Sequence, residues 1–588
     1  MGSLVSKKGS ANITVPGRNK SSKASPSSKP QDDQGENSDI SGKQGGTNSS
    51  EGGAKPLPPP DVGKPIEVKV CKVSDMQDGE MREVDVGGGK ALLIKEDGEF
   101  SALGHKCTHY GAPLVKGVLC NGRVRCPWHG ACFNAKTGDI EDFPGLDSLP
   151  KFEVTVENDN VVVKTNKKVL EKPKRMKEMS CHSPDNDTVY LIVGGGGAAI
   201  ACAETLRQEG FKGKVVMATK EPHLPYDRPK LSKALDSTGE ALALRDNNFF
   251  SVYDIEVLTE KEATSVDCPS KVVTFADGQT IAYDKLLIAT GGKPRPCTSP
   301  GSDLQNVCLL RSPADGNYIS QQGRGKNVVI VGTSFIGMEV AAYFAGKASS
   351  VSVVGVSSTP FGRVLGEQVG SILRKMHEEK GVKLYMNSGV VEFKGENGKL
   401  KEVVLQSGET IPADLCVVGI GVTPNTEFLS DSGIEMTNGA LDVDKTMQTS
   451  QDHVFAAGDI AHFPLPMADG EKVSIGHWQL AKAHGRCAAL NMLGQGVEFN
   501  SVPFFWTMQY GKSLRYAGHG AGFEDVVIEG SLEDMQFVAY YVKGDDVLAV
   551  ASMNRDPVVA QAAEIMHSGR TLSRADAEAG SDSWKSQL

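Results

Sequence analysis

No apolar run in this sequence reaches the roughly 18 residues that a helix needs to cross a membrane. The first residues carry no apolar segment typical of a secretory signal, so we expect neither a membrane span nor secretion. Basic residues are outnumbered, 63 against 73 acidic ones, which leaves a net charge of −10. Nucleic-acid-binding proteins normally carry a basic domain, so this balance argues against that class.

Cysteine is present, but not in the patterns that several chemistries require. The 12 Cys residues are scattered, which is unlike a secreted disulfide scaffold and favours a reducing compartment. There is no C-x-x-C-H for haem attachment, and no mononuclear site of two His and one carboxylate. The chain is therefore not expected to be a c-type cytochrome or an oxygenase.

The patterns along the sequence predict several domains. Residues 1–64 are rich in Ser, Gly, Lys and Pro and are expected to be disordered. Residues 65–168 show alternating strand patterns and turn signals, which predict a small antiparallel-β domain. A Lys-rich linker, 169–187, precedes buried strands that alternate with amphipathic helices, the pattern of doubly wound α/β domains. Strands and a last helix in 501–588 predict an α+β C-terminal domain.

The N-terminal tail fits two different targeting signals. Its first residues, MGSLVS, match the pattern for N-myristoylation at Gly2. Residues 1–30 hold six Lys or Arg and no Asp or Glu, and a basic patch is the usual second signal for peripheral membrane contact. The same composition fits a weak mitochondrial presequence, so a cytosolic membrane surface and the mitochondrion both remain open.

Two short motifs carry ligand-type side chains, Cys107-Thr108-His109 and Cys126-Pro127-Trp128-His129, with sixteen residues between them. A zinc ribbon usually pairs Cys with Cys, whereas each motif here mixes one Cys and one His. In a Rieske [2Fe–2S] centre both Cys bind one iron and both His bind the other, which two such loops would supply. A structural zinc site is the main alternative. Cys120 and Cys132 are expected to be core residues.

Two strand–loop–helix units predict dinucleotide sites. The first loop runs Gly194-x-Gly196-x-x-Ala199, and Glu221 lies 22 residues after Ala199, near the place of a ribose-binding acid. The second runs Gly332-x-Ser334-x-x-Gly337. Two units in one chain indicate two dinucleotides, FAD and NADH or NADPH. Gly355 stands where the second ribose-binding acid is expected, while Ser357, Ser358 and Arg363 nearby could tolerate a phosphate, so NADH is favoured only slightly.

The loops CTHYGAPL and CPWHGACF resemble the cluster loops of the Rieske family. Respiratory Rieske proteins carry a disulfide between these loops, and Ala112 and Trp128 occupy those Cys positions here. Hydroxyl donors of that branch are replaced by Ala131 and Phe133. Fewer hydrogen bonds to the cluster predict a reduction potential near the low end of the Rieske range, roughly −150 mV.

The segments PYDRPKLSK, LLIATGGKPR, VFAAGDIA and GHWQLA resemble the pyridine-nucleotide flavoprotein reductases. With the Rieske loops and GKSLRYAG, the chain is identified as a member of the apoptosis-inducing factor family, in its Rieske-bearing branch. The resemblance implies an FAD-binding domain at 188–320 and 446–500, an NAD(P)H-binding domain at 321–445, and a Rieske domain at 65–168. The residues that it implies as FAD contacts are Arg228, Lys233, Ala289, Thr290, Gly291 and Asp459, with Trp478 near the flavin ring.

The resemblance also implies a route for electrons. The helix after the first nucleotide loop lacks the C-x4-C dithiol of glutathione-reductase-type flavoenzymes and offers only Cys202. We therefore expect an NAD(P)H oxidoreductase that passes electrons through FAD to the cluster and on to an unidentified acceptor. Glu339 resembles a residue that approaches nicotinamide; a helix-start charge favoured by the dipole is the alternative. Glu339, Trp478 and Lys233 are the predicted catalytic residues. A redox-sensing pro-apoptotic signalling protein and a purely structural cluster are the competing hypotheses.

Overall fold

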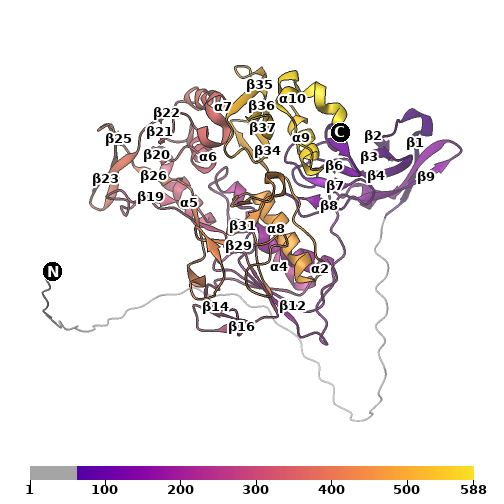
Figure 1. Cartoon of the computed structure of the whole chain (residues 1–588), viewed down its shortest axis with the longest axis horizontal. Coiled ribbons are helices and arrows are strands. Elements are labelled where there is room, and N and C mark those ends of the chain that lie inside the picture. The colour runs from indigo at the N-terminus through magenta and orange to yellow at the C-terminus, as the bar shows by residue number, and fades with distance from the viewer. Residues whose placement is uncertain (1–62) are drawn as a thin grey trace, which may run out of the picture. The chain divides into compact units, whose positions relative to one another are not determined.

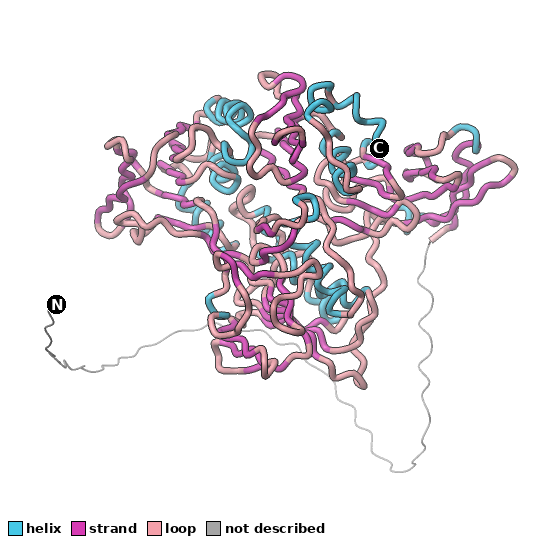
Figure 2. Tube along the Cα trace, viewed as in Figure 1, coloured by secondary structure: helices cyan, strands magenta, loops and turns pink. Residues whose placement is uncertain are grey.

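The computed structural model describes residues 63–588, which lie within one compact unit. Gly2 and the rest of the basic tail fall outside the described residues. Among the described residues, no helix combines the length and the apolar character that crossing a membrane requires. Residues 63–168 form mainly strands and loops, and the longer helices lie in the later parts of the chain (Figure 1 and Figure 2).

The N-terminal domain consists of two antiparallel sheets, as the alternating pattern of 65–168 predicts. The larger sheet has the order β1-β10-β9-β4-β3-β2, formed by Pro65–Lys72, Asn160–Asn166, Lys151–Glu157, Glu99–Gly104, Gly89–Glu96 and Glu80–Val86. The smaller has the order β5-β6-β7-β8, formed by Val118–Cys120, Arg123–Arg125, Cys132–Asn134 and Ile140–Asp142. The core of the smaller sheet also includes Ala201, which belongs to the first nucleotide-binding unit.

The first nucleotide-binding unit has a five-stranded parallel sheet of order β13-β12-β11-β17-β30. These strands are Ile255–Leu258, Lys214–Ala218, Val189–Val193, Lys285–Ile288 and Val454–Ala456. Helix α2 (Gly197–Gln208) packs against α8 (Trp478–Met492), although about 270 residues separate them in sequence (Figure 1). Their contact brings the first glycine loop beside the segment that begins at His477. A small sheet, β14 to β16, adds Ala263–Asp267, Val272–Phe275 and Thr280–Ala282.

The second nucleotide-binding unit repeats the architecture, with the strand order β19-β26-β20-β21-β22. The strands are Val307–Leu309, Leu415–Val418, Asn327–Val331, Ser350–Val354 and Val382–Tyr385. Its helices are α5 (Pro313–Gly323), α6 (Phe335–Phe344) and α7 (Gly362–Glu378). A β-meander, β23 to β25, follows at Val390–Glu396, Lys399–Leu405 and Thr410–Pro412. The two units are joined by the pair β18 (Gly292–Pro294) and β27 (Val422–Pro424).

The C-terminal domain is an antiparallel sheet of order β33-β34-β37-β36-β35 covered by helices. Its strands are Phe504–Gln509, Lys512–Gly518, Asp546–Met553, Gln536–Lys543 and Asp525–Ser531. Its helices are α9 (Val558–His567), α10 (Arg574–Ala579) and α11 (Ser581–Trp584). Helix α9 contacts the smaller N-terminal sheet, because Glu564 bonds Arg125 there (Figure 1). The predicted mixture of an antiparallel-β domain, doubly wound α/β units and an α+β end is confirmed.

Candidate functional site

The two predicted ligand loops lie side by side at one end of the smaller N-terminal sheet. Cys107 and His109 stand on the loop after β4, which a bridge between Lys106 and Pro113 closes. Cys126 and His129 stand on the loop between β6 and β7. The imidazole rings of His109 and His129 lie 4.9 Å apart between centroids and meet at 81°. The fold thus pairs Cys with Cys and His with His.

The environment of these four side chains suits a metal cluster. Cys107 and Cys126 are 3% and 0% exposed, and a hydrogen bond to Cys126, together with burial, raises the pKa of Cys107. Burial lowers the pKa of His109 to about 2 and that of His129 to about 3, which keeps both imidazoles in the neutral form that binds metals. Nδ1 of His109 is buried and has no hydrogen-bond partner among residues 63–588. A polar atom in that state needs a ligand, and iron would supply one.

In residues 63–588, no three His, Cys, Asp or Glu side chains converge to hold a single metal ion. A Rieske cluster needs only two protein ligands on each iron. The other two cysteines near the loops contact protein groups: Cys132 lies 3.7 Å from the Glu564 carboxylate and Cys120 lies 3.7 Å from the Leu588 carbonyl. Trp128 packs beside His129, with 6.3 Å between ring centroids.

A cavity of about 930 Å³ runs between the two nucleotide-binding units and reaches the C-terminal domain. Most of the predicted nucleotide and catalytic residues line it, namely Gly194, Gly196, Glu221, Arg228, Lys233, Ala289, Thr290, Gly291, Ser334, Glu339, Asp459 and Trp478. Ala199, Gly332 and Gly337 do not line it. Ala199 is fully buried in α2, and a Cβ on Gly337 would lie 2.1 Å from the Gly332 carbonyl oxygen, so these positions serve close helix–strand packing.

The first glycine loop is shaped for close approach to a ligand. Gly194 has a φ of +132°, and a Cβ there would lie 2.2 Å from the carbonyl oxygen of Ala289. The next loop along the sheet edge is fixed by Thr290, whose hydroxyl donates to the carbonyl of Asn425 at 2.8 Å. Any side chain at 194 would collide with this edge, so the sequence keeps glycine there.

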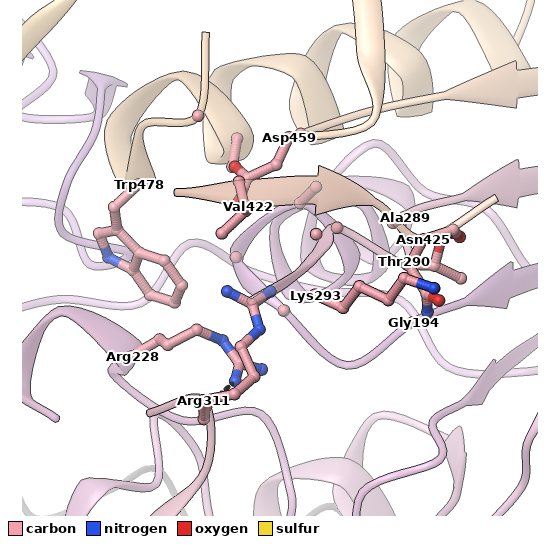
Figure 3. A pocket seen from close by; sticks show the side chains of 18 of the residues that line it. Gly194, Arg228, Ala289, Thr290, Lys293, Arg311, Val422, Asn425, Asp459 and Trp478 are labelled. Atoms are coloured by element: carbon pink, nitrogen blue, oxygen red, sulfur yellow. Dashed lines mark hydrogen bonds between the residues drawn. The ribbon is translucent and has the colours of Figure 1, made fainter. Parts of the chain in front are cut away.

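Two guanidinium groups give the cavity a positive region. Figure 3 shows Arg228 and Arg311 reaching into it, opposite Asp459 and Trp478. Arg228 donates to the Glu221 carboxylate at 2.8 Å and to the Arg311 carbonyl at 2.7 Å. Burial lowers the pKa of Arg311 to about 10, and repulsion from Arg228 adds to this. An anion such as the pyrophosphate of FAD would relieve that repulsion, so these residues fit the cofactor.

Glu221 lies in the cavity wall but already has partners. Its two oxygens accept from Arg228 at 2.8 Å and from the Tyr226 hydroxyl at 2.7 Å. Burial raises the pKa of the Glu221 carboxyl, but the Arg228 charge and these hydrogen bonds outweigh burial, and the pKa lies below its ordinary value. The predicted contact with a ribose therefore stays a prediction.

Glu339 is held in a buried hydrogen-bond network rather than exposed at a helix start. The carboxylate is in a side chain only 5% exposed and accepts from Lys233 Nζ at 2.8 Å and Ser232 Oγ at 2.5 Å. Its second oxygen accepts from Thr507 Oγ1 at 2.7 Å. The sequence resemblance linked Lys233 and Glu339 to the same reaction, and the fold brings them into contact across 106 residues.

Trp506, on β33, stands between the cavity and the ligand loops. It lines the cavity, and its ring centroid lies 4.5 Å from the ring centroid of His129 and 5.6 Å from that of His109. Sequence reasoning missed Trp506 and Arg311. Arg311 directly precedes the Ser312 capping box of α5, and Trp506 sits in the apolar run PFFWTM, but neither pattern indicates a cofactor contact.

Three family models match the chain in succession. Residues 66–153 match the Rieske [2Fe-2S] domain, residues 188–485 match the pyridine nucleotide-disulphide oxidoreductases, and residues 504–587 match the reductase C-terminal domain. These matches account for the paired loops, for the two nucleotide-binding units and for the sheet that carries Trp506.

Individual relatives agree with these matches. Apoptosis-inducing factor 3 of Homo sapiens is 54% identical over 529 residues, which cover 89% of this chain and 87% of that protein. Putidaredoxin reductase CamA of Pseudomonas putida is 31% identical over 65% of this chain and 92% of its own length. Among solved structures, the covalent putidaredoxin reductase–putidaredoxin complex superposes with a TM-score of 0.63 at 30% identity, covering 65% of this chain and 94% of that chain.

Proposed function

This chain belongs to the Rieske-bearing branch of the apoptosis-inducing factor family, and on that premise we propose that it passes electrons from NAD(P)H by way of FAD to its own [2Fe–2S] cluster and then to an acceptor protein. It is an FAD-dependent NAD(P)H oxidoreductase by family. FAD supplies the chemistry that converts a two-electron hydride into single electrons, which is what a [2Fe–2S] cluster can accept.

The observation that carries the proposal is the position of Trp506. Trp506 lines the nucleotide cavity, and the centroid of its ring lies 4.5 Å and 5.6 Å from those of the predicted ligands His129 and His109. An aromatic ring in contact with both places shortens the gap between the flavin site and the cluster site. The chain therefore joins on one polypeptide what the putidaredoxin complex holds as a reductase and a separate protein.

The residues of the cavity have distinct proposed roles. Gly194 and Gly196 let the backbone approach the FAD pyrophosphate, and Arg228 and Arg311 balance its charge. Asp459 is the proposed ribityl contact, and Trp478 packs beside the flavin ring. Ser334 also lines the cavity and belongs to the second glycine loop, which is the proposed site of NAD(P)H.

Lys233 and Glu339 form the proposed charge pair of the reaction site. The carboxylate fixes the ammonium group in the cavity wall, at 2.8 Å, and two further donors, Ser232 and Thr507, fix the carboxylate. A fixed positive charge beside the cavity favours the anionic, reduced state of a bound ring and attracts the negatively charged NAD(P)H. These roles make Lys233 a catalytic residue and Glu339 its positioning partner.

The proposal is tested by mixing the purified holoprotein rapidly with NADH or NADPH and following both chromophores. We expect the flavin absorbance to bleach first and the cluster absorbance to follow. If NAD(P)H bleaches the flavin but the cluster never changes, the proposed order of electron transfer is wrong. Comparing NADH with NADPH in the same experiment measures the cofactor preference.

A second candidate function is a pro-apoptotic signalling role in which electron transfer is secondary. The name of the human relative favours it, because that protein is called an apoptosis-inducing factor. A Cys126→Ser, His129→Ala double variant separates the two functions. Full death-promoting activity of this variant in cells would make electron transfer secondary. The mitochondrion is the proposed location by the same resemblance, with a membrane surface reached through Gly2 as the alternative.

A further inference from the structure

A buried histidine lies in the last turn of α7, where the second nucleotide-binding unit meets the C-terminal domain. His377 is 0% exposed and is not among the residues that line the nucleotide cavity. Its Nε2 lies 2.7 Å from Gln509 Oε1, and its Nδ1 lies 2.9 Å from the hydroxyl of Tyr510. Burial lowers the pKa of His377 to about 4, so near neutral pH the ring is uncharged and carries a single N–H.

Strand β33 connects this histidine to the reaction site. Thr507 and Gln509 lie on one face of the strand and are each 3% exposed, whereas Met508 between them points the other way and is 55% exposed. Gln509 Nε2 lies 3.3 Å from Thr507 Oγ1, which in turn lies 2.7 Å from Oε1 of Glu339. A continuous chain of hydrogen bonds therefore joins His377 to the carboxylate of the proposed charge pair.

The direction of every bond in this chain is fixed from its inner end. Glu339 is paired with Lys233 at 2.8 Å, so its carboxylate can only accept hydrogen bonds. The single hydroxyl hydrogen of Thr507 must then point at Glu339, and the hydroxyl oxygen must accept from the Gln509 amide. The amide oxygen of Gln509 consequently faces His377, whose Nε2 has to carry the hydrogen. Nδ1 of the ring is left as an acceptor for the tyrosine hydroxyl.

The imidazole selects one of two orientations of the Gln509 side chain. A side-chain amide turned by 180° keeps its shape, and the turned amide would present its oxygen to Thr507. Thr507 would then donate to Gln509, and Oε1 of Glu339 would lose its donor in a buried place. The N–H of His377 opposes this turn because it needs an acceptor.

Packing alone does not account for this chain of polar side chains. Replacing both partners of a buried hydrogen bond by apolar groups of the same shape can be close to neutral for stability. Apolar residues would therefore fill this boundary between domains equally well, whereas only polar groups can orient a carboxylate.

We propose that His377 is a positioning residue for the Lys233–Glu339 pair and acts on it through Gln509 and Thr507. The proposal rests on the proposed function, in which the fixed Lys233 ammonium group favours the reduced state of the bound ring. It extends the reaction site to the end of α7 and to the C-terminal sheet. No covalent or proton-transfer step is involved, since each hydrogen stays on its donor.

The reduction potential of bound FAD, measured by equilibrium titration of the purified holoprotein, tests the proposal without turnover. His377→Met has no donor and should lower the equilibrium constant for flavin reduction about tenfold, which is about 30 mV for a two-electron couple. His377→Gln keeps a side-chain N–H at a similar reach and should keep the wild-type potential. Tyr343→Phe is the matched control on α6, because it removes a buried hydroxyl that lies 2.8 Å from Ser320 Oγ. A wild-type potential in His377→Met, or an equal fall in His377→Gln or the control, overturns the proposal.

A double-mutant comparison separates positioning from a purely structural role. Thr507→Val removes the hydroxyl that contacts Glu339 and should lower the flavin potential at least as much as His377→Met. Adding His377→Met to Thr507→Val should cause no further fall, because the histidine acts only through that hydroxyl. Additive falls would overturn the proposal. If His377→Met does not retain FAD, Gln509→Met breaks the same chain, and a wild-type potential in that variant overturns the proposal as well.

Failure of this proposal and failure of the proposed function give different results. Lys233→Met should lower the flavin potential whether or not His377 acts on the pair, and an unchanged potential would refute the role given to Lys233. Reduction of the cluster by NAD(P)H in the wild type reports on the electron route. A fall in Lys233→Met without a fall in His377→Met overturns the positioning role alone.

Discussion

Replacing Glu564 by Ala should loosen the N-terminal domain from the rest of the protein. Glu564 on α9 is 2% exposed and bonds the guanidinium of Arg125, which is 1% exposed and belongs to the sheet beneath the cluster loops. A second arginine, Arg123, approaches the other Glu564 oxygen at 3.4 Å. The substitution removes one of the two carboxylates, Glu564 and Asp142, that the buried Arg125 and the partly buried Arg123 share.

The magnitude follows from what Arg125 retains. Removing one member of a buried ion pair costs about 3–5 kcal/mol. Arg125 keeps hydrogen bonds to Asp142 at 2.8 Å and to the Gly130 carbonyl at 2.9 Å, so the cost lies near the lower end of that range. For a domain of about 100 residues, where 1 kcal/mol corresponds to ~4–8 °C, unfolding of the N-terminal domain should begin at least ~10 °C lower.

The assay is the temperature at which the cluster absorbance is lost, compared with the wild type. Glu99→Ala is the control, because it breaks the exposed Lys136–Glu99 pair in the same domain, where both side chains are more than half exposed. Such a pair contributes about 0–1 kcal/mol, so the control should shift by only a few degrees. Flavin bleaching by NAD(P)H should not change, since Glu564 does not line the cavity. A Glu564→Ala protein that loses its cluster at the wild-type temperature would refute the reasoning.

Four further substitutions test the site. Trp506→Ala should slow cluster reduction at least tenfold without slowing flavin bleaching, and equal rates in wild type and variant would remove Trp506 from the route. Gly194→Ala should abolish FAD binding, because its Cβ would lie 2.2 Å from a carbonyl oxygen, whereas Gly210→Ala, also at positive φ but in open space, should keep the flavin; the flavin content of the two purified proteins decides. Gly355→Glu should raise kcat/KM for NADH relative to NADPH, because an acid at this position would bind the ribose. Thr333→Gly is added to make room, since Thr333 atoms lie as close as 2.3 Å to a Cβ at 355. An unchanged kcat/KM ratio contradicts the prediction. The cluster should titrate near −150 mV, Ala131→Ser should raise that potential by adding a donor, and a wild-type value above about +100 mV would show that the missing donors do not control it.

The nucleotide and cluster motifs were readable from sequence because local chemistry constrains them. Gly194 is required because its φ is positive and the carbonyl oxygen of Ala289 leaves no room for a side chain. The glycine in the sequence therefore signals the tight turn directly. Cys107, His109, Cys126 and His129 sit at spacings that only two short loops can deliver. The alternation over 65–168 and the apolar strands after 188 were also readable from sequence. Each depends on the hydrophobic pattern within one short segment.

The surroundings of Glu339 could not be predicted from the local sequence. From sequence, a charge near a helix start was an equal alternative, since the dipole favours it. The fold instead buries the carboxylate among Lys233, Ser232 and Thr507, which come from two segments far from α6 in the sequence. No periodicity within α6 contains that information.

The sequence by itself indicated the cofactor classes and predicted the domain order and the ligands of the cluster, because each depends on residues close together in the chain. Only the tertiary structure decided how the cofactor sites are connected. Trp506 meets His129 across more than 370 residues, Tyr110 meets Asp227 across 117, and Arg125 meets Glu564 across 439. Such contacts arise where separately folded surfaces pack, and their partners share no spacing that a sequence pattern could reveal.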